Sequence, residues 1–152
     1  MSAAAGRRPR PWRARTLVLI ALGGAVGATA RDQLEQAFPA ASGGWPWATF
    51  WINVSGAFVL GLLLEMLAVL GPDEGWRRRM RLGVGTGLLG GYTTYSSFAV
   101  ETVLLGRDRD LVVALGYAVA SLVAGFAAAY VATVAISKAH RRVVVRQMET
   151  AR

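Results

Sequence analysis

Cysteine is absent from this 152-residue chain, and histidine occurs once, as His140 in a basic segment. Without cysteine the chain has no disulfide, no thiol nucleophile and no cysteine-ligated metal. The single histidine argues against histidine catalysis and against a zinc site. Charged residues are also scarce, at 17%, whereas a typical soluble domain carries about 25%. The composition therefore argues against enzymes that depend on these side chains.

Hydrophobic residues instead make up 54% of the chain, and they gather in four runs, at 16–30, 48–70, 82–105 and 111–137. About 20 apolar residues are needed to cross the hydrocarbon core of a membrane. The last three runs reach that length, and the first does so only by including Arg31 and its neighbours. Because the connections are short, the sequence predicts an all-α membrane protein with four transmembrane helices. Four such spans exclude a soluble enzyme.

The segments outside these runs are strongly basic. Residues 1–15 contain proline and are expected to be disordered, residues 138–152 form a basic C-terminal tail, and 16–137 is the transmembrane domain. Four spans place both tails and the 71–81 loop on one side, with fourteen of the 17 lysines and arginines. The positive-inside rule then predicts that both termini are cytoplasmic and that the chain lies in the inner (plasma) membrane of the cell. The net charge of +8 thus needs no nucleic acid to explain it.

The first run has a second interpretation, as a cleavable signal peptide. A basic start, an apolar run and the sequence Ala-Thr-Ala at 28–30 fit that pattern. We favour a retained helix, because three further spans make cleavage unnecessary. The sequence GTGLLG at 85–90 also matches a dinucleotide-binding pattern, but it lies inside an apolar run rather than between a strand and a helix.

The third run contains a polar stretch, GGYTTYSSF at 90–98. Hydrocarbon holds no water, so an irregular backbone and a row of hydroxyls remain unsatisfied there unless they line a cavity or are buried in protein. We predict that Gly90 and Gly91 break the helix. Carbonyls freed by such a break can bind a cation, and the N–H groups of the restarting helix favour an anion. The alternative is a kinked helix whose hydroxyls bond to its own backbone, and the density of polar groups favours the break.

Two other runs carry polar residues. Asn53 in the second run either forms a hydrogen bond between two helices or has a functional role. The fourth run has small or polar residues at every fourth position, which share one face of a helix. That face is either a packing surface or a hydroxyl track along a polar path. Its members are Tyr117, Ser121, Gly125, Ala129 and Thr133.

Three motifs together resemble the CrcB or Fluc family of fluoride channels. They are GGAVGATAR at 23–31, TFWINVSGAFVLG at 49–61 and GVGTGLLGGYTTYSSFAVE at 83–101, and the resemblance extends over about residues 22–133. It implies a fluoride-selective channel, not an enzyme, that passively exports cytoplasmic fluoride across the membrane and lowers fluoride toxicity. It also implies two subunits packed antiparallel, each with four transmembrane helices and a third helix broken at mid-membrane.

The resemblance also implies roles for particular residues. The fluoride pore would be lined by Asn53, Tyr95, Ser97, Phe98, Tyr117 and Ser121. A structural sodium ion would lie at the dimer interface, held by the backbone carbonyls of Gly90 and Thr93 of both subunits. Arg31 and Glu101 match charged positions near the pore entrances and receive no mechanism. The chain departs from the family at Tyr95, where phenylalanine is usual, and at Gly125, where some members carry a hydroxyl.

The charge bias leaves the partner open. A chain that inserts in both orientations should show little bias, so we predict that this one inserts mainly one way and pairs with a homologous subunit of opposite orientation. It would then be a partner-dependent or even non-conducting subunit of a heterodimeric fluoride channel. A small multidrug exporter is the other alternative, but it needs a membrane-embedded carboxylate. Glu65 and Glu101 lie towards span ends.

Overall fold

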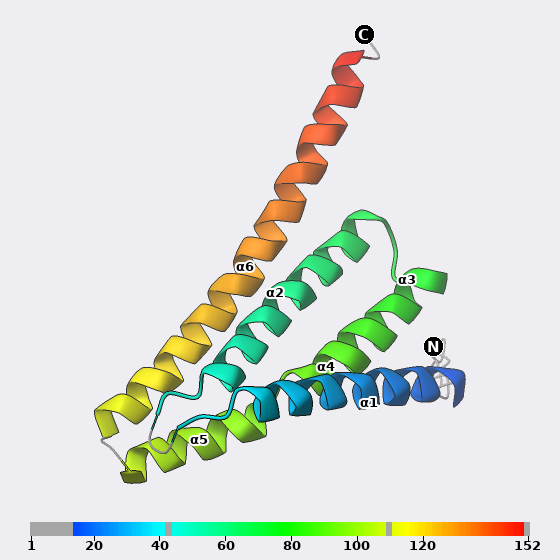
Figure 1. Cartoon of the computed structure of the whole chain (residues 1–152). Coiled ribbons are helices and arrows are strands. Elements are labelled where there is room, and N and C mark those ends of the chain that lie inside the picture. Colours follow the sequence, from blue (N-terminus) through cyan, green and yellow to red (C-terminus); the bar gives the residue numbers. More distant parts are fainter. Residues whose placement is uncertain (1–13, 42–43, 109–110, 151–152) are drawn as a thin grey trace, which may run out of the picture.

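Helices make up all the regular structure within the residues that the computed structural model describes, 14–41, 44–108 and 111–150. The predicted all-α class is therefore confirmed. The elements, shown in Figure 1, are α1 (Ala14–Ala37), α2 (Trp47–Val69), α3 (Gly75–Met80), the π-helix η1 (Arg81–Leu89), α4 (Gly90–Tyr92), α5 (Tyr95–Asp108) and α6 (Leu111–Thr150).

Three of these helices, α1, α2 and α6, are long and apolar enough to cross a membrane. The predicted span at 82–105 is instead divided among η1, α4 and α5, with residues 93 and 94 outside any helix. α1 has 24 residues and continues past the predicted run at 16–30. The predicted disorder at 1–15 lies mostly outside the described residues, and its last two residues already belong to α1.

α1 packs against η1 and α4, and glycines make this close contact possible. A side-chain carbon at Gly27 would overlap the carbonyl oxygen of Leu88, and one at Gly91 would overlap that of Gly24. The two backbones thus touch directly, as small residues permit in pairs of membrane helices.

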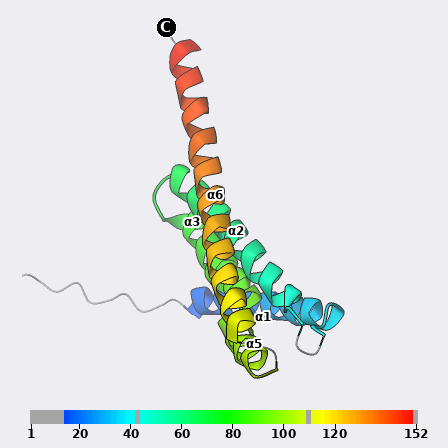
Figure 2. The same ribbon diagram turned by 90° about the vertical axis from the view of Figure 1, so that its left-hand side faces the viewer.

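α2 and α6 form the second main pair and lie side by side in Figures 1 and 2. A side-chain carbon added at Gly61 of α2 would come within 2.8 Å of the carbonyl oxygen of Ala129 on α6. Ala132, on the next part of α6, has 0% exposure. This portion of the small-residue face on α6 is therefore a packing surface, which was one of its two interpretations.

The connection from α2 to α3 is held by an ion pair. Gly71 has a φ of 123°, a conformation that favours glycine. Asp73 accepts hydrogen bonds from Arg81 at 3.0 Å from Nε and 2.7 Å from Nη2. The hydrogen bonds from Arg81 hold the pKa of Asp73 below its ordinary value of 3.8. The pair ties the loop after α2 to the first residue of η1.

α6 continues as a single helix to Thr150, beyond the predicted span at 111–137. The described part of the basic C-terminal tail is therefore helical. In Figure 2 this end of α6 extends past the other described helices.

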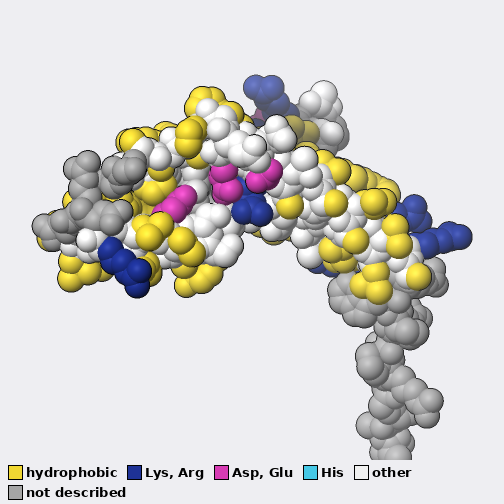
Figure 3. Space-filling model, turned by 60° about the horizontal axis from the view of Figure 1, so that its bottom comes forward, with side chains coloured by type: hydrophobic (Ala, Val, Ile, Leu, Met, Phe, Trp, Pro, Cys, Tyr) yellow, Lys and Arg dark blue, Asp and Glu magenta, His cyan; other side chains and the backbone are white. Residues whose placement is uncertain are grey.

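Hydrophobic side chains cover much of the surface of the described residues. Figure 3 shows one face, on which they surround a small group of acidic and basic side chains. Phe126 is 78% exposed and Tyr95 is 79% exposed. So much exposed apolar surface indicates contact with lipid or with another protein.

Candidate functional site

The helical path of the third predicted span stops two residues after the glycine pair. The N–H of Thr93 still donates to the carbonyl oxygen of Leu89, at 3.0 Å. Thr93 then turns extended, with φ −77° and ψ 154°, and α5 begins at Tyr95. Gly90 and Gly91 are both helical residues of α4. The prediction that they mark the break was therefore wrong in position, because Gly91 serves packing against α1 and other residues divert the backbone.

Asn53 of α2 is the first of these residues. Its amide Nδ2 donates to the carbonyl oxygen of Thr94 at 2.9 Å. The N–H of Thr94 donates back to Oδ1 of Asn53 at 2.8 Å. The side-chain amide thus pairs with both backbone groups of Thr94, which is only 8% exposed. Asn53 therefore joins α2 to the residues between α4 and α5, and it holds Thr94 outside the helix.

The diverted N–H groups release two particular carbonyls. In an α-helix the N–H of Thr94 would donate to Gly90, and the N–H of Ser97 would donate to Thr93. Here the first goes to Asn53, and the second goes to Oγ1 of Thr94 at 3.1 Å. The carbonyls of Gly90 and Thr93 therefore lack their helical donors. They are the two that the sequence resemblance assigned to a sodium ion.

Aromatic rings continue from this interruption along α5 to α6. The ring centroids of Tyr95 and Phe98 lie 5.9 Å apart, and those of Phe98 and Tyr117 lie 5.5 Å apart. Trp45, from the connection before α2, meets Tyr117 edge-on at 5.3 Å. Three of the predicted pore residues thus form one row of contacts, with Tyr95 at its exposed end and the fully buried Tyr117 at its inner end.

The row ends at a carboxylate. Tyr117 Oη donates to Oε2 of Glu101 at 2.8 Å. Thr49 Oγ1 donates to Oε1 of the same side chain at 2.6 Å. Thr49 lies in the first turn of α2. Glu101 therefore lies level with the start of α2, in agreement with its predicted position towards the end of a span. Both carboxylate oxygens are held by buried hydroxyl groups.

The two predicted serines differ in their hydrogen bonding. Ser97 Oγ accepts a bond from Thr94 Oγ1 at 3.2 Å. Ser121, one turn after Tyr117 on α6, is 8% exposed, and its Oγ has no hydrogen-bond partner among the described residues. A buried hydroxyl without a partner carries a free-energy cost, so it is available to bind a ligand at little further cost.

One predicted residue stands apart, and two others were missed. Arg31 pairs with Glu35 on its own helix, at 3.7 Å, and does not join the cluster. Thr49 carries a sequence signal, since it precedes Asn53 by one helical turn. Trp45 carries no such signal, because a tryptophan in a loop before a span is also expected as an interfacial anchor. The indole Nε1 of Trp45 is buried without a partner in the part of the chain that is described.

Comparison with known proteins gives a consistent family. The family described as "CrcB-like protein, Camphor Resistance (CrcB)" matches residues 18–133. "Fluoride-specific ion channel FluC 2" of Leifsonia xyli subsp. xyli is 50% identical over 125 residues, covering 82% of this chain and 85% of its own. "Fluoride-specific ion channel FluC 1" of Cutibacterium acnes is 43% identical over 118 residues, covering 78% and 82%. "Fluoride-specific ion channel FluC" of Caulobacter vibrioides is 42% identical over 115 residues, covering 75% and 89%.

Proposed function

Because the chain belongs to the CrcB-like family, we propose that it is a fluoride-specific ion channel, not an enzyme, that lets cytoplasmic fluoride leave the cell passively. The observation that carries this proposal is the continuous row from Tyr95 through Phe98 to Tyr117. Hydroxyl groups of Ser97 and Ser121 accompany it. Expelled fluoride no longer accumulates, and its toxicity falls.

The chemistry of the row suits fluoride. The ion is small and strongly hydrated, so a pore must replace its water with several donors at close range. Ser121 offers an unpaired hydroxyl, and the ring edges of Phe98 and Tyr95 are electropositive. Asn53 uses one amide hydrogen on Thr94 and keeps a second for the anion. Among the described residues, no ion pair or cation–ring contact joins a lysine or arginine to the row, so the ion would not be held too long to pass.

A second subunit would complete the pore wall. Tyr95 is 79% exposed at the open end of the row, although it lies beside the buried Thr94. We propose that η1, α4 and α5 together make the third membrane crossing, interrupted near mid-membrane at 93–94. An antiparallel partner would then cover Tyr95 and bring the two interruptions together.

The freed carbonyls fit a structural sodium ion. No cluster of three or more His, Cys, Asp or Glu side chains that could hold a metal occurs in the described ranges, so backbone oxygens are the available donors. Carbonyls of Gly90 and Thr93 from two antiparallel subunits would supply them, and the cation would hold the dimer together. We expect the melting temperature of the purified dimer to fall when sodium is replaced by a large organic cation at equal ionic strength.

The chain's orientation sets its partner. The strong bias of basic residues supports an inner-membrane protein with both termini in the cytoplasm, paired with a homologous subunit of opposite orientation. The chain has no cysteine, so a single cysteine placed at residue 2 or 40 reports its side cleanly. Labelling of one site only, from outside intact cells, supports a heterodimer. Comparable labelling of both sites from outside contradicts it and supports a homodimer.

Fluoride efflux from liposomes tests the function itself. The purified chain is reconstituted alone, a potassium ionophore balances charge, and a fluoride electrode follows release, with chloride release as the selectivity control. We expect fluoride-selective efflux, lost in Phe98→Ile and kept in Phe126→Ile, which changes an exposed ring on α6.

If the chain alone is silent, co-reconstitution with a homologue of opposite charge bias decides between the alternatives. Restored efflux identifies a partner-dependent subunit. Silence in both preparations overturns the conducting role, and the multidrug exporter then becomes testable by proton-coupled uptake of cationic dyes.

A further inference from the structure

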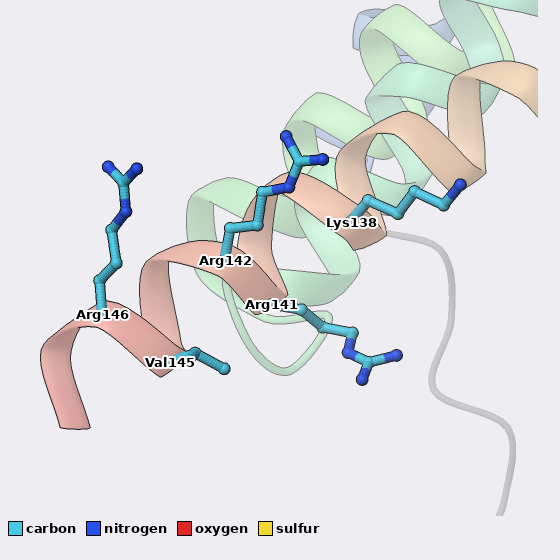
Figure 4. A pocket seen from close by; sticks show the side chains of 5 residues that line it. All are labelled: Lys138, Arg141, Arg142, Val145 and Arg146. Atoms are coloured by element: carbon cyan, nitrogen blue, oxygen red, sulfur yellow. The ribbon is translucent and has the colours of Figure 1, made fainter. Parts of the chain in front are cut away.

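The C-terminal part of α6 carries a group of basic side chains that the proposed channel does not use. Lys138, Arg141, Arg142 and Arg146 are exposed and line a surface pocket together with Val145. Figure 4 shows them projecting from successive turns, with Arg142 and Arg146 on one side of Val145 and Arg141 on the other. Within the described residues, the ion pairs are formed by other arginines, and these four side chains make none.

Their charges reinforce one another. The spacing of three and four residues places all four on one face of the helix. The single acidic residue of α6 is Glu149, beyond the last of them. Four unpaired cations on one face create a positive potential that attracts anions. A ligand for this face should therefore carry several negative charges, or offer several singly charged groups side by side.

The α2–α6 pair shows where the face lies relative to the membrane. Trp47 and Trp51, both more than half exposed in the first turns of α2, mark one membrane interface. Glu65 follows Trp47 by 18 residues, which is about 27 Å of helix. The hydrocarbon core is about 30 Å thick, so Glu65 marks the opposite interface. Ser137 donates a hydrogen bond to Glu65, which places the end of the apolar part of α6 at that level.

The basic face begins directly beyond this level. Lys138 follows Ser137, and Arg146 lies about 12 Å further along the helix at 1.5 Å per residue. The polar headgroup layer on each side of the hydrocarbon is roughly 5–8 Å thick. Lys138, Arg141 and Arg142 therefore lie within the headgroup layer, at the depth of the lipid phosphates, and Arg146 lies outside that layer.

We propose that this face of α6 binds the phosphate groups of anionic phospholipids in the leaflet that it reaches. A guanidinium group binds phosphate with two parallel hydrogen bonds, and Arg141 and Arg142 both lie at the phosphate level. Val145, 48% exposed, lies between these basic side chains and adds no acidic group that would oppose an anion. The interaction is independent of fluoride conduction, and it favours the orientation that places α6's end in the more anionic leaflet.

Lipid selectivity of the full chain tests the proposal. The protein is reconstituted in phosphatidylcholine vesicles, and spin-labelled phosphatidylglycerol and phosphatidylcholine are compared by the fraction of each that is immobilised on the protein. Arg141→Gln/Arg142→Gln should lower the preference for phosphatidylglycerol about tenfold, since each basic residue near a charged surface strengthens binding several-fold. Arg141→Lys/Arg142→Lys should keep most of it. About 0.5 M salt should weaken it by screening.

The matched control is Arg78→Gln/Arg79→Gln, which removes the same charge from two exposed residues of α3. It should leave the preference nearly unchanged. An equal loss in this control means general charge attraction and overturns a site on α6, as does an unchanged preference in the α6 variant. Inorganic phosphate that displaces the lipid better than chloride at equal ionic strength would identify a soluble ligand instead. Circular dichroism verifies that each variant remains helical.

Discussion

α6 and the segment 81–108 both contain glycines and hydroxyl residues, but only the segment 81–108 is interrupted as a helix. α6 stays helical over 40 residues, although Gly116 and Gly125 lie within it. The segment 81–108 leaves the helix just after a glycine pair that is itself helical. What distinguishes it is a set of acceptors that compete for its N–H groups, above all the amide of Asn53. Glycine permits close packing, and competing side chains determine where the helix stops.

The comparison also separates two parts of the proposed pore wall. The interrupted segment supplies backbone carbonyls that have lost their helical donors, which suits a cation. α6 satisfies its own backbone and supplies only side chains, the ring and hydroxyl of Tyr117 and the free hydroxyl of Ser121. The proposed anion pathway and the proposed cation site would thus lie side by side because only one of the two helices is interrupted.

Removing the amide of Asn53 should have the largest effect on this difference. Asn53→Ala leaves the N–H and C=O of the buried Thr94 unpaired, at about 1–3 kcal/mol for each group. We expect the free energy of unfolding in detergent to fall by roughly 2–5 kcal/mol. On α6, Ser121→Ala removes a buried hydroxyl that has no partner among the described residues, so stability should stay the same or rise. Equal losses in the two variants would contradict the role given to Asn53.

Glycines in the two regions should respond differently to a methyl group. In Gly91→Ala the new carbon overlaps the backbone of α1 at Gly24, which cannot move aside as a side chain can. Overpacking of this kind costs about 1–3 kcal/mol. Gly125→Ala on α6 meets no atom within 4 Å and should be neutral or slightly stabilising, because alanine favours helix. Thermal unfolding of both variants against the parent measures the contrast.

The sequence predicted the all-helical class because long apolar runs leave few other structures in a membrane. The resemblance to fluoride channels assigned Tyr95, Phe98 and Tyr117 to one pore, and the structure places their rings in contact. The sequence misplaced the interruption, because helix propensity points to glycine whereas the acceptor that ends the helix lies about forty residues away in sequence. Long-range competition of this kind leaves no local pattern.

Two further contacts lay beyond the sequence for a similar reason. Thr49 and Glu101 are separated by 52 positions, and no local pattern indicates that their side chains meet. Trp45 looks like an interfacial anchor until the fold places its ring against Tyr117. Helicity of the C-terminal tail was also missed, because its basic composition equally suits a disordered segment.

Tyr117 on α6 and Glu101 on α5 join the two regions through a hydrogen bond, which a substitution at Tyr117 removes. Tyr117→Phe keeps the ring that contacts Phe98 but loses the hydrogen bond to Glu101. Without this bond the Tyr117 ring and the Glu101 carboxylate are no longer held together at the inner end of the row, so we expect fluoride efflux to slow about tenfold while some conduction persists. Tyr130→Phe, at a 65% exposed position on α6, should conduct as the parent does. A slower Tyr130→Phe channel would show that hydroxyl loss anywhere on α6 has this effect.

The smallest expected effect is on thermal stability and concerns the ion pair between Asp73 and Arg81, the first residue of the interrupted segment. The folded state holds the pKa of Asp73 below 3.8 through its bonds to Arg81. A lowered pKa stabilises the fold at pH values above the unfolded pKa, and this contribution disappears as the pH falls through the folded value. The melting temperature should therefore drop slightly more between about pH 6 and pH 3 in the parent than in Asp73→Asn, which cannot titrate there. About half of the Asp73 side chain is exposed to solvent, so the difference should amount to only about one or two degrees and should shrink in high salt. A parent and a variant with the same pH dependence would mean that α2 and η1 are held together by packing alone.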